Sequence, residues 1–264
     1  MKKLKVLNIN YKGISGKERF ILEKIKESAL ITFGAKEVER ISGFSTNSVH
    51  SLLFSLRRKG VLVKLMRDRH ALKETLFEKK FLVATELFKP CYISFWSALS
   101  YYGFTEQQPA AIQIASTKQL KRVELKEIII WPTTIKPKNF FGYEELNGFV
   151  IASEEKALVD SILMPENAGG LNEFIKCLEN AWIDINKDKF IQYLLMTNNK
   201  SVNSRAGFLI ERMKLPIKKE LLEKLRKNSS KGFIRLDQTK KIKNEYNKNW
   251  KIIINTEIKE EEIF

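Results

Sequence analysis

The chain has few of the residues from which metal sites and secreted scaffolds are built. It contains two cysteines and two histidines in 264 residues. Cys91 and Cys177 stand far apart in apolar surroundings, so a disulfide framework is excluded and a cytoplasmic location is expected. Neither a Cys-x-x-Cys pair nor a His-Glu-x-x-His motif occurs, which argues against a zinc site. No metal or other cofactor is expected.

Long apolar runs are also missing. No stretch of 18 or more apolar residues occurs, so the sequence predicts no membrane-spanning helix and no membrane partner. Residues 1–10 lack the apolar run of a secretory signal peptide. Hydrophobic residues nevertheless make up 44 % of the chain and aromatic residues 11 %. This composition is sufficient for a folded core and excludes a disordered polycation.

Positive charge is what the sequence has in excess. The formal net charge is +16 at pH 7. Residues 1–75 contain 17 Lys and Arg against 7 Asp and Glu, so about +10 (17 − 7) lies in under a third of the chain. Such a field attracts polyanions, and nucleic acid is the commonest one inside a cell. A lysine-rich proteome is the alternative source of this charge, and it requires no polyanion partner.

The basic N-terminal part has the pattern of a winged helix-turn-helix. Apolar residues at helical spacing predict helices over 16–32, 35–42 and 45–59. Ser45 can cap the third helix, and Gly60 can end it. The apolar segments 61–65 and 71–76 can then pair as a hairpin with a basic tip. This order predicts a winged helix-turn-helix that binds DNA, with a purely structural three-helix unit as the alternative.

The third predicted helix has one apolar side and one polar side. Its apolar stripe, which must pack on the first two helices, consists of Val49, Leu52, Leu53 and Leu56. On the opposite side, Asn47 can read adenine and Arg58 can read guanine or hold a phosphate. Phe54 can touch a thymine methyl group, or its ring can tuck under the wing. The predicted DNA-binding residues are Ser45, Thr46, Asn47, His50, Ser51, Phe54, Arg57, Arg58, Lys59, Lys64, Arg67 and Arg69.

The rest of the chain mixes strand and helix patterns. Strands are expected at 112–115, 123–125, 128–131, 149–152 and 250–255. Helices are expected at 78–89, 94–102, 171–183, 187–197, 201–213 and 217–227, with another opening at Ser153. Pro132 and Pro137 are expected to bound a loop, and residues 257–262 form an acidic tail. The predicted fold class is α+β, with a winged helix-turn-helix domain over 1–75 and a mixed α/β domain with a helical C-terminal part over 76–264.

Two short motifs suggest enzyme chemistry only weakly. The segment from Gly13 to Lys17 has the wrong spacing for a phosphate-binding loop. Glu124 and Lys126 match half of a metal-dependent nuclease site, but no second acid suitable for holding the metal precedes them. A nuclease of a defence system is therefore kept as the alternative to a binding protein without enzymatic activity.

The segment 153–160 has a denser set of polar residues. Ser153 can cap a helix whose positive end suits Glu154 and Glu155. Lys156 and Asp160 are i, i+4 neighbours and can form an ion pair on the helix surface. The simpler interpretation is a capped, salt-bridged helix start on the surface. The sharper interpretation is a contact site for phosphate or for a protein.

Three stretches together resemble the AbiEi antitoxins of the type IV AbiE toxin–antitoxin systems. The stretches are YISFWSALSYYGFTEQ over 92–107, IASEEKALVD over 151–160 and SRAGFLIE over 204–211. The ending WKIIIN over 250–255 is also similar. Glu155 stands where the family has proline, Ala206 where it has leucine, and the wing has Arg69–His70 in place of its usual ending.

The resemblance implies a two-domain repressor. Its winged helix would bind double-stranded operator DNA at inverted repeats upstream of its own operon. Its second domain would counter a nucleotidyltransferase-like toxin encoded next door, and the family acts without a stable toxin complex. The candidate antitoxin site is Ser94, Ser153, Glu154, Lys156 and Asp160. A solitary transcriptional regulator without a toxin is the remaining alternative.

Overall fold

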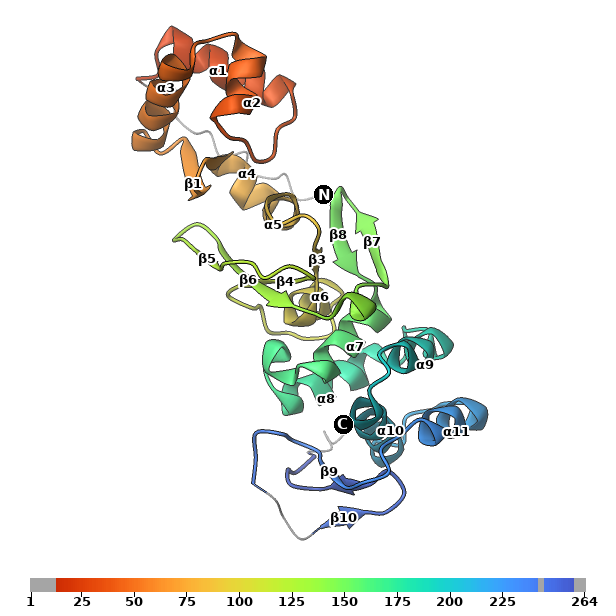
Figure 1. Cartoon of the computed structure of the whole chain (residues 1–264). Coiled ribbons are helices and arrows are strands. Elements are labelled where there is room, and N and C mark those ends of the chain that lie inside the picture. The colour runs from red at the N-terminus through yellow and green to blue at the C-terminus, as the bar shows by residue number, and fades with distance from the viewer. Residues whose placement is uncertain (1–12, 242–244, 259–264) are drawn as a thin grey trace, which may run out of the picture.

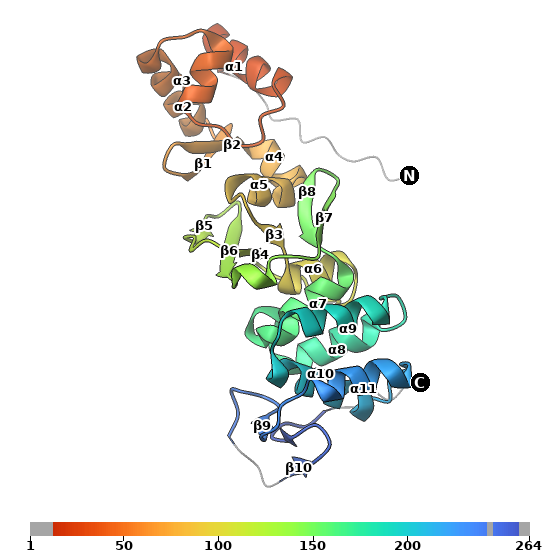
Figure 2. The same ribbon diagram turned by 45° about the vertical axis from the view of Figure 1, so that its right-hand side comes forward.

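The computed structural model describes residues 13–241 and 245–258. The expectation for residues 1–10 and most of the acidic tail lie outside these ranges. The fold is α+β, as predicted, and its elements follow one another along a long axis (Figures 1 and 2). The first three helices lie at one end and a small C-terminal sheet lies at the other. Among the described residues, no helix is both long and apolar enough to cross a membrane.

The N-terminal unit is a winged helix-turn-helix. Its elements are α1 (Gly16–Glu27), α2 (Ala35–Ser42), α3 (Thr46–Arg58), β1 (Leu62–Met66) and β2 (Arg69–Leu72). Helix α1 ends earlier than predicted because Ala29 adopts φ +50 and Leu30 N–H bonds back to Ile25 O, which closes the helix in a Schellman motif. The predicted α2 agrees with the structure. The second hairpin strand ends at Leu72, where α4 (Lys73–Glu78) begins.

Helix α3 is held by the apolar stripe that the sequence predicted. Val49, Leu53 and Leu56 are buried in a cluster with residues of α1 and α2, and Leu52 packs against this cluster. Burying such side chains stabilises the unit by about 1.5–3 kcal/mol each. The polar side of α3 is consequently turned away from the core.

A six-stranded mixed sheet follows. Its strands are β3 (Tyr92–Ile93), β4 (Ile112–Ser116), β5 (Val123–Glu124), β6 (Ile129–Thr134), β7 (Tyr143–Leu146) and β8 (Phe149–Ala152), in the order β5-β6-β4-β3-β8-β7. Strand β3 pairs antiparallel with β4 and parallel with β8. Two helices, α5 (Lys80–Leu87) and α6 (Phe95–Tyr101), pack against these strands. The parallel pair brings residues 93 and 151 side by side, which places two of the three family-like stretches together.

The prediction that a loop begins at Pro132 is wrong. Pro132 lies inside β6 and pairs with Ile114 of β4. Strand β5 covers only Ile129 and Ile130 on the other side of β6. From Trp131 onward β6 is therefore an edge strand, where the missing N–H of proline is tolerated.

A group of helices follows this sheet in the chain. They are α7 (Glu154–Leu163), α8 (Leu171–Ala181), α9 (Lys187–Met196), α10 (Lys200–Arg212) and α11 (Lys219–Lys227). Three short strands then form a second sheet in the order β10-β11-β9, namely β9 (Ile234–Arg235), β10 (Tyr246–Asn247) and β11 (Ile252–Ile253). Helix α10 packs against β11, which joins the small sheet to the helices.

The buried hydrophobic residues form two clusters. The smaller one runs from Ile21 to Leu72 and the larger from Leu65 to Ile252. Leu65 and Ala71, from the two strands of the hairpin, belong to the larger cluster. The hairpin therefore contributes to both clusters, and the domain boundary at residue 75 stays a prediction.

Candidate nucleic-acid interface

The polar side of α3 is exposed along its length. Asn47, Ser51 and Arg58 are all solvent-exposed. Phe54 is 52 % exposed, so its ring does not tuck under the wing. The guanidinium carbon of Arg57 lies 5.3 Å from the centroid of the Phe54 ring, which is within the range of a cation–π contact. The interface thus presents a polar stripe with one aromatic ring whose orientation is supported by a neighbouring cation.

The N-terminus of α3 differs from the prediction in one detail. Ser45 occupies the N-cap position, but its hydroxyl makes no capping bond to the backbone. The Ser45 Oγ lies 2.9 Å from the Ser48 Oγ instead. Ser45 and Thr46 are exposed, so the first turn of α3 faces solvent. Helix N-termini of this kind are suited to holding a phosphate.

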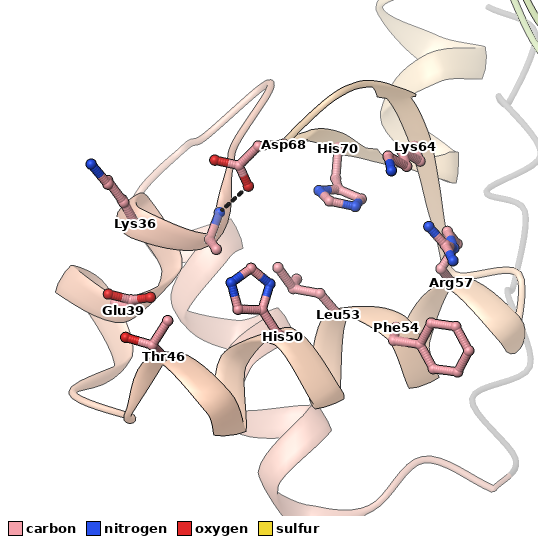
Figure 3. Close-up of a pocket in the computed structure, with 11 residues that line it drawn as sticks. Lys36, Glu39, Thr46, His50, Leu53, Phe54, Arg57, Lys64, Asp68 and His70 are labelled. Atoms are coloured by element: carbon pink, nitrogen blue, oxygen red, sulfur yellow. Dashed lines mark hydrogen bonds between the residues drawn. The ribbon is translucent and has the colours of Figure 1, made fainter.

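A groove lies between α2, α3 and the wing. Its volume is about 460 Å³, and α2 contributes Lys36 while α3 contributes His50 and Arg57 (Figure 3). Lys64 and His70 line it from the hairpin. Sequence reasoning missed Lys36 and His70. Lys36 belongs to a helix whose predicted role was only to support α3, and His70 was expected in the basic tip.

His70 forms part of the floor of this groove. Its side chain is buried, and burial together with the nearby charges of Lys64 and Arg57 lowers its pKa. Among the described residues its Nδ1 has no hydrogen-bond partner.

The wing is fixed to the start of α2 by three contacts. Asp68 Oδ1 accepts a hydrogen bond from the Ala35 N–H at 3.0 Å, and the Phe33 and His70 backbones bond to each other in both directions. Arg69 Nη1 lies 2.8 Å from Glu37 Oε1. A Cβ at Gly34 would lie 2.6 Å from the Asp68 carbonyl oxygen, so this close approach requires glycine. Arg69 is therefore engaged within the protein, whereas Arg67 at the tip is exposed.

Lys59 is also engaged within the protein. Its Nζ donates to both carboxylate oxygens of Glu18, at 2.8 and 2.7 Å. Burial raises the pKa of Glu18, but hydrogen bonds from Lys59, Ser55 and Ser15 outweigh it and lower the pKa to about 2. A phosphate at Lys59 would have to compete with this carboxylate. Lys59 and Arg69 are thus two predicted DNA-binding residues that already pair with a carboxylate of the protein.

The candidate antitoxin residues form a network inside the protein. Lys156 Nζ lies 2.5 Å from Asp160 Oδ1, and both side chains are buried, at 0 % and 1 % exposed. Asp160 Oδ2 also accepts hydrogen bonds from the Tyr92 hydroxyl at 2.9 Å and the Ser94 hydroxyl at 2.8 Å. The predicted ion pair is confirmed, but its predicted surface location is wrong. Ser94 occupies the N-cap position of α6, but its hydroxyl donates to Asp160 and makes no capping bond.

This network lies between helix α7 and strand β3. Ser153 caps α7 as predicted, because its Oγ accepts from the Lys156 N–H. The Lys156 ammonium lies 4.4 Å from the centroid of the Phe141 ring. Burial raises the pKa of Asp160, against the opposing effect of Lys156. Of the five candidate residues, Glu154 alone is not buried, so a partner protein could not contact the other four directly in this conformation.

The third family-like stretch lies at a close contact within the C-terminal part. The fully buried Trp250 packs on Gly207, where a Cβ would lie 2.2 Å from the indole ring. Trp250 Nε1 donates to Glu211, which lies on α10 together with Gly207. The stretch over 204–211 and the ending over 250–255 thus pack against each other.

The nuclease alternative finds no support in the arrangement of acids. Glu124 is exposed on the short strand β5. In the described ranges, no group of three or more His, Cys, Asp or Glu side chains is placed to hold a metal ion.

The fold is similar to that of a solved structure. The chain is similar to the RV2827C protein of Mycobacterium tuberculosis, with a TM-score of 0.64 and 14 % sequence identity. The likeness covers 91 % of this chain and 92 % of that chain. A scan against protein-family models and a search of curated proteins find no match. At this identity the likeness shows the fold alone.

Proposed function

We propose that this protein is a transcriptional regulator that binds double-stranded DNA through α3 and the wing. The observation that carries the proposal is the exposed side of α3, with Asn47, Ser51 and Arg58, beside a groove with basic residues on three of its elements. The width of an α-helix matches the major groove, where such side chains reach base edges. Arg67, which is exposed at the tip of the wing, would contact the DNA backbone in this proposal.

Binding to the region upstream of the gene tests this proposal. The full chain should bind that duplex more tightly than a random one, with affinity falling steeply as salt rises. Asn47→Ala should cost about 1–3 kcal/mol on the specific duplex and much less on the random one, because the amide would read a base. Arg58→Ala should weaken operator binding and leave the protein folded.

Matched controls lie far from α3. Asn172→Ala and Lys227→Ala remove an exposed amide and an exposed charge from α8 and α11. Both variants should bind the upstream duplex as the unchanged protein does. Salt-independent affinity, or equal losses for Asn47→Ala and Asn172→Ala, would contradict the proposal.

We further propose that the protein is an autoregulating repressor and the antitoxin of a nucleotidyltransferase-like toxin. The resemblance to AbiEi antitoxins supports this role. The stretches that carry the resemblance form the buried Asp160 network and the Gly207–Trp250 contact. They therefore lie in the interior of the protein and are not scattered over its surface. The test is co-expression with the neighbouring gene. Rescue of growth would support the antitoxin role, and a harmless neighbour would favour a solitary regulator.

A further inference from the structure

A second hollow lies at the opposite end of the molecule from α3. It is formed where α10 begins beside β9 and β11, and its volume is about 500 Å³. The polar and aromatic residues that line it are Asn199, Ser201, Arg205, Phe233, Arg235 and Gln238. None of these residues takes part in the buried Asp160 network or in the face of α3.

Arg205 is the most unusual of these residues. Its side chain is buried, at 5 % exposed, and among the described residues no carboxylate lies within ion-pair distance of it. Its Nε donates to the backbone oxygen of Arg235 at 3.0 Å. The amide oxygen of Gln238, once the amide is oriented toward the guanidinium, accepts from Nη1 and Nη2 at 3.0 and 3.1 Å. A buried cation held only by neutral acceptors is costly, and a bound anion would stabilise it.

A second guanidinium adds to the positive charge. Burial and the nearby Arg235 both lower the pKa of Arg205. Asp237 is the acid that offsets this effect, but its Oδ1 accepts from the backbone and hydroxyl of Thr239. Its Oδ2 lies 3.8 Å from Lys240 Nζ. Two arginines therefore line one hollow, and within the described ranges neither of them forms an ion pair. Arg205 donates to neutral acceptors, and Arg235 Nη1 donates to the Lys240 backbone oxygen at 3.2 Å. Such an arrangement suits a phosphoryl group.

An exposed aromatic pair lies at the edge of the hollow. Phe233 is 46 % exposed, and its ring meets that of Tyr246, which is 49 % exposed, at a centroid distance of 5.3 Å. Lys251 Nζ lies 5.4 Å from the Phe233 centroid. Exposed rings beside a phosphate site are the means by which proteins stack a nucleotide base.

We propose that the Arg205–Arg235 hollow binds the phosphoryl group of a nucleotide, with the base stacked on Phe233. A free mononucleotide and the phosphorylated end of a single strand share this chemistry. The proposal is independent of duplex binding, because none of its residues belongs to the winged helix-turn-helix.

Calorimetric titration of the full chain tests the site. The probes are AMP, adenosine, inorganic phosphate and a short 5′-phosphorylated single-stranded oligonucleotide. AMP should bind more tightly than adenosine or phosphate. Arg235→Gln should weaken AMP binding at least about tenfold, and Phe233→Ala about fivefold or more. Both side chains are exposed, so these variants should fold even if Arg205→Gln does not.

Lys227→Gln is the charge-matched control, because it removes one exposed positive charge from α11. It should change AMP affinity less than about twofold. Tighter binding of the oligonucleotide than of AMP would assign a strand end as the ligand, and equal binding would assign a free nucleotide; both support the site. The proposal is overturned if neither AMP nor the oligonucleotide binds, or if phosphate binds as tightly as AMP. It is also overturned if Lys227→Gln and Arg235→Gln weaken AMP binding equally.

Discussion

Helices α3 and α7 both carry polar side chains at helical spacing, yet α3 turns them to solvent and α7 turns them to the core. Asn47 and Arg58 are exposed, whereas Lys156 and Asp160 are almost wholly buried. On α3 the polar groups are exposed and remain hydrated. On α7 they have lost their hydration, so each must be satisfied by another group of the protein. Changes on α3 should therefore act on binding, and changes on α7 on stability.

The largest expected effect is that of Asp160→Ala. Removing this carboxylate leaves the buried Lys156 ammonium unpaired and two hydroxyls without their acceptor. The free energy of unfolding should fall by about 3–5 kcal/mol, as measured by urea denaturation. DNA affinity at a temperature where the variant is folded should be unchanged.

The exposed pair of Lys24 and Glu27 on α1 is the control for this variant. Glu27→Ala should cost less than about 1 kcal/mol. The double variant Lys156→Met/Asp160→Leu should recover much of the stability, because it removes the buried charges together. A loss below 1 kcal/mol for Asp160→Ala would erase the contrast between α7 and α3.

Gly207→Ala tests whether the C-terminal part is as tightly packed as the centre. The added methyl group would overlap the buried Trp250 ring, which cannot move without disturbing its bond to Glu211. We expect a loss of about 3 kcal/mol in unfolding free energy. Gly232→Ala, which has no heavy atom within 4 Å of the new Cβ, should be nearly neutral. Equal melting temperatures for the two variants would show that Gly207 and Trp250 are loosely packed.

Glu18 offers a smaller effect that depends on pH. Its pKa is about 2 in the folded protein and 4.5 ordinarily, so its contribution is present above pH 4.5 and is lost as the pH falls from 4.5 toward 2. Glu18→Gln should lower the unfolding free energy by about 2 kcal/mol at pH 7. The difference from the unchanged protein should shrink toward pH 2. Glu23→Gln, an exposed change on the same helix, should show no such trend.

The smallest expected effect separates two cations of the winged helix-turn-helix. Arg67 is exposed at the tip of the wing, while Lys59 is paired with Glu18. Arg67→Ala should reduce the slope of log affinity against log salt by about 0.9, the value for one phosphate contact. Lys59→Ala should change the slope less and lower stability instead. The opposite ranking would place Lys59 on the DNA.

The fold was predictable where local patterns decide it. The period of the apolar residues located α2 and α3, and the turn and basic tip located the hairpin. Strand β7 was missed because Glu144 and Glu145 at its centre face solvent and leave no apolar alternation. The strand order of the large sheet depends on β3 pairing with β8 across more than fifty residues of chain. No local pattern encodes such a pairing.

The candidate sites were predictable only in part for a related reason. The i, i+4 spacing of Lys156 and Asp160 predicted their ion pair, but spacing alone does not say which way a helix faces. The partners that bury the pair, Tyr92 and Ser94, come from a distant segment. Lys59 was likewise predicted to bind DNA, and its pairing with Glu18, a residue 41 positions earlier in the chain, became evident only in the structure.

The contacts that hold Asp68 and His70 to the start of α2 also fix the position of the wing. They hold the wing at a fixed distance from α2, and α2 packs on α3, so the separation between α3 and the wing does not depend on a ligand. If the unit binds DNA as we propose, a duplex that contacts both elements would have to conform to that separation by bending or by a change in groove width. Stiff and pliable base steps differ in the energy of that adjustment. Operators would thus be sorted partly by their flexibility, at positions that no side chain touches.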